Sequence, residues 1–493
     1  MNKKSISLFD ALVPIVVLIG LLGLNVFLYG DDSLGGANQL ALLLGTGVAT
    51  IIGIKNNSNW EHIIKGISKS ISSTAPAIII LLLIGSLAGT WLISGIVPSM
   101  IYYGLQILNP KIFLFASCII CAIVSLASGS SWSTIATVGI ALLGIGEALE
   151  ISTGLVAGSI ISGAYFGDKL SPLSDTTNLA PAMAGTDLFT HIRYMLYTTV
   201  PSYIITLLLF LFIGFSINSD VSNNDVQNIL NSLNQSFYIS PWLFSVPILL
   251  FVLIIKKVPS IPALLISSLL GGFFAAIFQP DIIKQIANLN SSYIKSHPIE
   301  ILTGVEFQYI KASYIGIINA MGSDTSIITD NKIMNDLLSS GGMYGMLNTI
   351  WLIICAMCFG GTMEAIGALK KISQSIIKYA NSTGSLIATT ACTCLFFNTT
   401  ASDQYLSIVV PGKMYSDAFK KKKLAPENLS RTLEDSGTVT SVLIPWNTCG
   451  ATQSGVLGVA TIIYLPFCFF NIISPIMTII YGYFNIKIRR LKD

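Results

Sequence analysis

Five acidic residues lie within apolar stretches of the sequence: Asp168, Asp175, Asp403, Glu434 and Asp435. A charge near the middle of a bilayer costs at least about 2.5–3.5 kcal/mol, so such residues tend to mark an ion pathway or a proton relay. Hydroxyl and amide side chains accompany them, as in GDKLSPLSDTTNLAP at 167–181 and FNTTASDQ at 397–404. Hard cations take carboxylate, hydroxyl, amide and carbonyl oxygens as ligands. The sequence therefore predicts a site for a hard cation.

The candidate ion or substrate ligands come from four segments of this kind. They are Ser128, Ser130, Ser131, Asp168, Asp175, Thr176, Thr177 and Asn178 in the first half, and Asn398, Thr399, Thr400, Asp403, Glu434, Asp435, Asn447 and Thr448 in the second. We expect Na⁺ at Asp175 first and at Asp403 second, because hydroxyl groups flank both acids at an inferred turn or break. For each hydroxyl the structural alternative is to cap a half-helix or close a turn.

Lys169 is the one basic residue that we place at membrane depth. One hypothesis is that it neutralises Asp168, its neighbour, or another acid in an internal ion pair. The other is that it binds the carboxylate of an organic anion. Burial favours the neutral form of a carboxyl group and a bound cation favours the charged form. Sodium and protons can therefore compete for one acid.

The elements that must position these residues are transmembrane helices. The chain of 493 residues is 53% hydrophobic and only 10% charged, with a mean hydropathy of +0.73, whereas soluble chains carry about 25% charged residues. Full spans of about 30 Å are expected at 8–29, 37–54, 75–97, 194–217, 237–255, 259–279, 346–369 and 456–482. No small-residue cleavage pattern follows the first run, so we expect that span to remain in the mature protein.

Four remaining regions do not fit simple spans. Stretches 111–150 and 385–419 are predicted to be re-entrant hairpins that turn at SGSSWST and FNTTASDQ, and 155–190 and 428–455 are predicted to be interrupted helices. In GDKLSPLSDTTNLAP we expect Gly167, Pro172 and Pro181 to keep the backbone unwound. Each half then contains a span, a hairpin, an interrupted helix and a span in opposite orientation, a pattern typical of secondary transporters with inverted repeats.

The fold class predicted is thus an all-α polytopic membrane protein with inverted repeats. Its expected parts are N-terminal spans with an amphipathic cytoplasmic segment at 1–74, a first repeat at 75–217, linking spans and an outer loop at 218–345, a second repeat at 346–482 and a cytoplasmic tail at 483–493. With both termini in the cytoplasm, 21 of the 27 Lys and Arg residues lie inside and five outside, as the positive-inside rule favours.

Other function classes find little support in the residues. Seven of the eight cysteines fall in apolar stretches and the three histidines form no cluster, so we expect neither a cofactor nor a resident metal. No His, Ser and acid constellation typical of an enzyme appears, and nothing points to a nucleic-acid partner. A channel is disfavoured because opposed hairpins suit alternating access better than a continuous pore.

Three segments resemble the NhaC-type sodium/proton antiporter family of the ion-transporter superfamily: SLASGSSWSTIATVG, SGAYFGDKLSPLSDTTNLAP and LSRTLEDSGTVTSVLIPWNTCGA. That family also contains exchangers that couple sodium to malate and lactate. The resemblance implies Na⁺/H⁺ antiport in a prokaryotic inner membrane, by a homodimer with an elevator-like motion. The alternative is Na⁺-coupled exchange or symport of a small organic anion or amino acid, in which SGSSWST and PWNTCGA form opposed hydroxyl and N–H cradles at helix N-termini.

Overall fold

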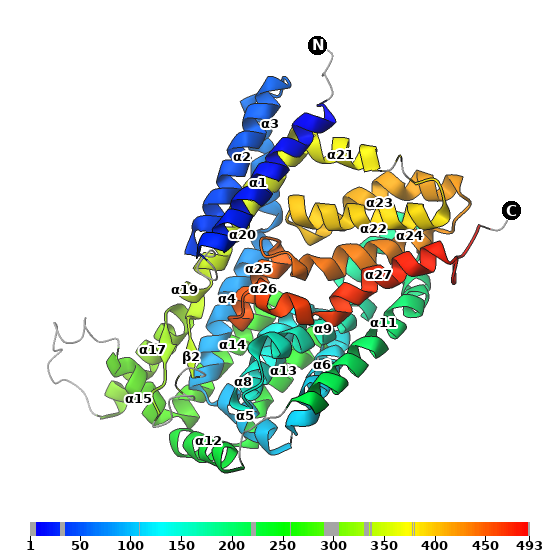
Figure 1. Ribbon diagram of the computed structural model, residues 1–493. Coiled ribbons are helices and arrows are strands. Elements are labelled where there is room, and N and C mark those ends of the chain that lie inside the picture. Colours follow the sequence, from blue (N-terminus) through cyan, green and yellow to red (C-terminus); the bar gives the residue numbers. More distant parts are fainter. Residues whose placement is uncertain are drawn as a thin grey trace.

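Helices make up nearly all of the structure (Figure 1). The computed structural model describes residues 6–29, 35–107, 109–217, 223–256, 258–289, 305–329, 335, 338–376, 378 and 380–491. The first half contains α1 Leu8–Tyr29, α2 Ala37–Lys55, α3 Trp60–Ser73, α4 Ala75–Ile93, α5 Ile96–Ile107, α6 Pro110–Ser128, α7 Ser131–Thr134, η2 Ile135–Gly139, α8 Ile140–Ala148, α9 Thr153–Leu170, α10 Asp175–Ala184 and α11 Leu188–Ser216.

The linking region and the second half complete the described chain. The linking region contains α12 Asn223–Ser236, η3 Pro241–Phe244, α13 Ser245–Ile255, α14 Ser260–Phe278, α15 Pro280–Leu289, α17 Val305–Gly322, β1 Thr325–Ser326, β2 Ser339–Ser340 and α19 Gly342–Gly345. The second half contains α20 Leu347–Ala365, α21 Ala368–Ile376, α22 Thr383–Thr400, α23 Gln404–Lys421, α24 Pro426–Leu433, η5 Glu434–Thr438, η6 Ser441–Leu443, α25 Thr448–Leu457, α26 Thr461–Tyr464, η7 Leu465–Phe467 and α27 Phe469–Tyr483.

The described residues include eight helices that are long and apolar enough to cross a membrane, or ten if two bent pairs each count as one span. This confirms an all-α polytopic membrane protein. Two predicted spans are wrong in detail. The stretch 456–482 divides into the end of α25, α26 with η7, and α27, with a 92° bend between α25 and the following pair. The stretch 237–255 is a short 3₁₀ turn followed by α13, bent by 83° from α12.

Two groups of helices pack side by side. The scaffold group consists of α1–α4, α14, α17, α19 and α20, and the core group of α6, α9–α11, α22–α24 and α27. In Figure 1 the blue helices α1–α4 lie along α20, and the orange and red helices α22–α24 and α27 stack beside them. The predicted outer loop is partly helical, since it contains α17. Helix α17 packs against α4. The inverted relation between the two halves stays a prediction.

Small residues permit close approach of helices in the core group. A Cβ added at Gly163 of α9 would lie 2.1 Å from the carbonyl oxygen of Cys118, and one added at Gly167 would lie 2.3 Å from that of Ala122. Both carbonyls belong to α6, so α9 and α6 pack backbone to backbone, as small residues allow in membranes. Gly167 therefore serves helix packing, which corrects our expectation that it interrupts the helix.

The unwound part of GDKLSPLSDTTNLAP is shorter than predicted. Helix α9 continues to Leu170 and α10 begins at Asp175, so Pro181 lies inside a helix and only residues 171–174 form the first break. The second break, residues 444–447, separates η6 from α25. In both breaks the next helix begins at a side-chain cap, Ser174 for α10 and Asn447 for α25.

The two expected turns occur close to their predicted places. The first tip, residues 128–131, separates α6 from α7, and Gly129 there has a left-handed φ of 71°. A Cβ at Gly129 would lie 2.6 Å from Cβ of Leu173, so the first tip contacts the first break. The second tip, residues 401–403, separates α22 from α23. Ser402 there has a φ of 59°, which is unfavourable for a residue with a side chain.

Candidate ion-binding site

A cavity of about 760 Å³ lies where both tips, the first break and the start of α25 meet the scaffold group. Three carboxylates line it: Asp168 from the end of α9, Asp175 from the start of α10, and Asp403 from the second tip. The facing residues come from the end of α3 and the starts of α4 and α14, with Ile254 of α13. The folding pattern thus gathers polar residues that are far apart in the chain around one cavity.

The structure divides the sixteen predicted ligands into two sets. Ser128, Ser130, Asp168, Asp175, Thr176, Asn178, Asp403 and Thr448 line the cavity. Ser131, Thr177, Asn398, Thr399, Thr400, Glu434, Asp435 and Asn447 are not among its lining residues. The first set is therefore the one that a solute in the cavity can reach in this conformation.

The three cavity acids are held in different ways. Asp168 is 8% exposed, and its Oδ2 accepts hydrogen bonds from Oγ of Ser131 at 2.7 Å and from the Ser131 backbone N–H at 3.2 Å. Asp403 is 6% exposed and caps α23, because its Oδ1 accepts from the Leu406 N–H at 2.8 Å. Asp175 is exposed to the cavity, and Tyr405 donates to it at 3.4 Å.

The three aspartates do not form a preassembled cage. Within the part of the chain that the structure describes, no three His, Cys, Asp or Glu side chains are close enough to hold a metal ion together. A bound cation would use one or two of the carboxylates and complete its shell with hydroxyl groups, carbonyls or water. A loosely built site of this kind suits a cation that binds and is released again.

Several predicted ligands make structural contacts instead. The hydroxyls of Thr399 and Thr400 donate back to carbonyls of their own helix, at 2.9 and 2.7 Å. Asn447 caps α25 by accepting from the Cys449 N–H at 3.0 Å, and its amide donates to Oδ1 of Asn398 at 3.2 Å. These contacts are the capping and back-bonding alternative that we set beside ligation.

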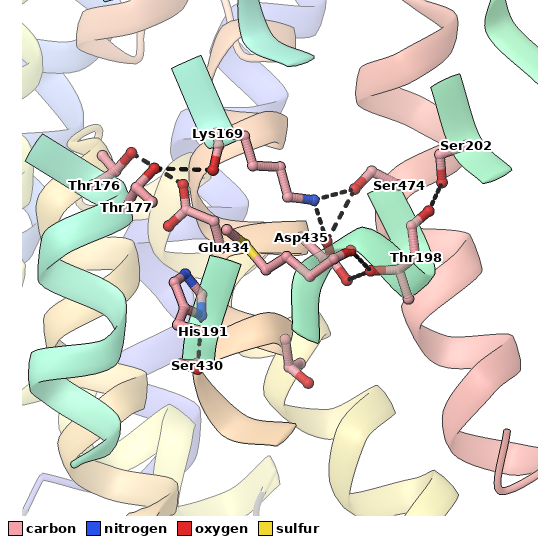
Figure 2. A network of polar contacts seen from close by, with 12 residues as sticks. Lys169, Thr176, Thr177, His191, Thr198, Ser202, Ser430, Glu434, Asp435 and Ser474 are labelled. Atoms are coloured by element: carbon pink, nitrogen blue, oxygen red, sulfur yellow. Dashed lines mark hydrogen bonds and ion pairs between the residues drawn. The ribbon is translucent and has the colours of Figure 1, made fainter. Parts of the chain in front are cut away.

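A second group of charged side chains, the buried cluster, consists of Lys169, Glu434 and Asp435, which Figure 2 shows close together. Lys169 pairs with Asp435 and donates to Oγ of Ser474 at 3.1 Å. The other oxygen of Asp435 accepts from Thr198 at 2.8 Å. Lys169 and Asp435 are both fully buried. The partner of Lys169 is thus an acid 266 positions away, contributed by η5, while Asp168 is held by Ser131.

Thr176 and Thr177 connect the buried cluster to the cavity. Thr176 lines the cavity, and its hydroxyl donates to Oε1 of Glu434 at 3.0 Å. The Thr177 hydroxyl lies within 3.2 Å of the Asp168 carbonyl and 3.0 Å of the Lys169 carbonyl (Figure 2). Thr177 therefore holds the last turn of α9, on which Asp168 and Lys169 point to different surroundings, while Thr176 reaches from the cavity to Glu434.

Sequence reasoning missed several participants. Tyr405 directly follows the predicted turn FNTTASDQ but was not among the candidates, and Thr198 and Ser474 lie in largely apolar stretches without an acid nearby. Arg431, one of the 21 basic residues that we place on the cytoplasmic side, is fully buried, and its guanidinium lies 4.5 Å from the centre of the Tyr194 ring. The aromatic face offers the cation a favourable electrostatic contact.

Comparison with known proteins places the chain in a family. Residues 163–486 match the sequence profile described as the Na⁺/H⁺ antiporter family. The malate-2H⁺/Na⁺-lactate antiporter of Bacillus subtilis is 37% identical over 97% of this chain and 94% of its own length. The Na⁺/H⁺ antiporter NhaC of Alkalihalophilus pseudofirmus is 37% identical, with 90% and 89% covered. The arginine/ornithine antiporter ArcD of Halobacterium salinarum is 34% identical, with 98% and 93% covered.

Profile and relatives agree over most of the chain, and the candidate membrane-spanning helices among the described residues agree with a multi-pass membrane transporter. The resemblance seen in three short segments of the sequence therefore extends to the whole polypeptide. The chain belongs to the Na⁺/H⁺ antiporter family of secondary transporters.

Proposed function

We propose that the protein exchanges Na⁺ for protons across the inner membrane of a prokaryote, as a homodimer with both termini in the cytoplasm. The observation that carries this proposal is the lining of the cavity. It has three carboxylates and several hydroxyl groups, and none of its described lining residues is Lys, Arg or His. Such a surface attracts cations and offers them oxygen ligands.

Asp168 is the group that couples the two fluxes in this proposal. It is nearly buried but faces the cavity, so it carries either a proton or a bound cation. Because Na⁺ needs the ionised carboxylate, a proton must leave before the ion binds. Competition for one group links sodium movement to proton movement without a separate proton path. Asp175, which is more exposed, attracts the ion into the cavity.

An organic solute moving together with Na⁺ is the second candidate. Relatives are named for malate and lactate and for arginine and ornithine, and the cavity volume of about 760 Å³ falls in the range of roughly 300–1,000 Å³ for pockets that bind organic ligands. Lys169 does not supply the cation for a carboxylate in this structure, because it lies outside the cavity lining and is paired with Asp435.

Proton flux in proteoliposomes tests the proposal. We expect an inward Na⁺ gradient alone to drive proton export, measured with a trapped pH-sensitive dye. Malate, lactate and arginine are then added one at a time at fixed ionic strength. Flux that requires one of these solutes, with none under Na⁺ alone, would replace simple Na⁺/H⁺ antiport by solute-coupled exchange.

Asp175→Asn is expected to raise the KM for Na⁺ about tenfold while the maximal rate changes little. The amide keeps the shape of the side chain and its contact with Tyr405, but it removes one negative charge from the cavity surface. The Na⁺ dependence of proton flux measures this effect. Asp417→Asn, at an exposed acid outside the cavity lining, is the matched control and should leave KM unchanged. An unaltered KM in Asp175→Asn would remove that residue from the entry path.

The proposed orientation predicts which engineered cysteines react from each side. Figure 1 places α3 and α21 at one end of the molecule and α12 and α15 at the opposite end. A cysteine at position 421 or 489 should react with an impermeant maleimide only from the cytoplasm, and one at position 225 in α12 only from outside. Cys392, which is exposed, is first replaced by alanine. Labelling of position 421 from outside would reverse the orientation.

A further inference from the structure

Five backbone N–H groups at helix N-termini around the cavity are already hydrogen-bonded to oxygen atoms of the chain itself. The pairs are Ser131 N–H with Asp168, Ser133 N–H with Ser130, Thr177 N–H with Ser174, Leu406 N–H with Asp403, and Cys449 N–H with Asn447. Helix N-termini are the usual source of donors for an anionic group. Here at least one N–H group at each of these N-termini is already occupied, which weakens the opposed N–H cradles that we considered for an organic anion.

The charge of the cavity lining also disfavours an organic anion. An organic carboxylate in the cavity would meet Asp168, Asp175 and Asp403, and the described lining contains no Lys, Arg or His to offset the repulsion. Of the cavity hydroxyls, that of Thr176 already donates to Glu434. A positively charged solute meets the opposite situation, because carboxylate and hydroxyl oxygens accept hydrogen bonds from an ammonium group.

The lining contributed by α4, α13 and the segment before α14 is largely apolar, and Ser73, Thr74 and Ser260 lie beside it. Pro76, Ala77 and Ile80 at the start of α4 and Ile254 and Val258 beside the start of α14 form this apolar wall. The rings of Trp132 and Tyr405 also line the cavity. A bare Na⁺ gains nothing from such surfaces, whereas an alkyl chain gains free energy by leaving water and an ammonium group is attracted to aromatic faces.

We propose that the cavity binds small organic ammonium ions, with the ammonium group at the carboxylates that take Na⁺ and the alkyl part against the apolar wall. This inference rests on the proposed Na⁺ site and names a further class of ligand for it. Since both ions use the same carboxylates, they bind in competition.

Displacement of radiolabelled Na⁺ from the purified, detergent-solubilised protein tests this. At constant ionic strength and pH 7.5, n-butylammonium, butyrate and 1-butanol present the same alkyl chain with a positive, a negative and no charge. We expect butylammonium to displace Na⁺ at concentrations at least tenfold below those of the other two. Inorganic ammonium isolates the alkyl contribution, and it should require about tenfold more than butylammonium, the equivalent of about two buried methylene groups.

Two variants assign the effect to the proposed wall. Ile80→Ser, which leaves all the carboxylates in place, should reduce the advantage of butylammonium over ammonium several-fold. Leu81→Ser, at a buried neighbour of the same helix that is not a cavity-lining residue, should preserve that advantage and controls for general loosening of α4.

The results separate this inference from the function that it rests on. Displacement of bound Na⁺ by butyrate, or equal potency of butylammonium and ammonium, would overturn the organic-cation inference and leave Na⁺/H⁺ exchange standing. A wild-type protein that binds no Na⁺ would overturn both. Preferential displacement by butylammonium that survives in Ile80→Ser would also overturn the inference, because the alkyl chain would then lie elsewhere.

Discussion

Lys169→Met is expected to destabilise the protein by about 3–5 kcal/mol, because removing one partner leaves the other charge of a buried pair uncompensated. Asp435 is fully buried, and its remaining donors, Thr198 and Ser474, are neutral hydroxyls. The consequence should appear as a fall of several degrees in the thermal unfolding midpoint in detergent. It should also appear as a loss of monodisperse protein during size-exclusion chromatography after mild heating.

A second substitution and a surface pair provide the controls for Lys169→Met. The double variant Lys169→Met/Asp435→Leu replaces both charges by apolar groups and should recover most of the lost stability. Lys284→Met breaks an ion pair with Asp281 in which both side chains are more than half exposed, and such pairs contribute only about 0–1 kcal/mol. A Lys169→Met protein as stable as the wild type would mean that Asp435 is not charged in the folded protein.

Asp168→Asn should abolish Na⁺-dependent proton flux, with a loss of at least about 100-fold, while the protein stays folded. The amide retains the shape of the side chain and an oxygen that accepts from Ser131. However, it cannot release a proton and cannot balance the charge of a bound ion. The flux assay in proteoliposomes measures the loss, and an unchanged unfolding midpoint shows that it is not due to misfolding.

Ser131→Ala is the matched test for the surroundings of Asp168. It keeps the carboxylate and the backbone hydrogen bond but removes the stronger contact at 2.7 Å. Flux should therefore fall only several-fold. Wild-type flux in Asp168→Asn would transfer the coupling role to Asp175 or Asp403, the other carboxylates of the cavity.

Hydropathy located helices such as α1, α2, α4 and α14 because a run of about twenty apolar residues carries its own signal. It failed at 456–482, where the chain stays apolar while its direction changes at the end of α25. Apolar composition shows that a segment avoids water but not which way it runs. The role of Gly167 was predicted wrongly for a related reason. The sequence does not distinguish a glycine that breaks a helix from one that lets a neighbouring helix, here α6, approach closely.

The sequence predicted which acids belong to the candidate site, but not how they are divided between the cavity and the buried cluster. Asp168, Asp175 and Asp403 stand out as acids among hydroxyls, and the structure gathers them at one cavity. The pairing of Lys169 with Asp435 depends on how η5 packs beside α9 and α27, a long-range contact with no local pattern. The burial of Arg431 against Tyr194 could likewise not be predicted, because the sequence does not show which aromatic ring packs against a basic side chain.

The two walls of the cavity come from different helix groups, and this separation has an evolutionary consequence. Substitutions at Ile80, Ala77 or Val258 reshape the space next to the carboxylates but leave the polar residues of the tips and the first break untouched. A lineage can therefore acquire a new transported solute through a few substitutions in the apolar wall, while the residues that bind the cation stay the same. Paralogues that share these acids and differ along the apolar wall would then diverge first in the solute that they transport, and only later in the ion that drives transport.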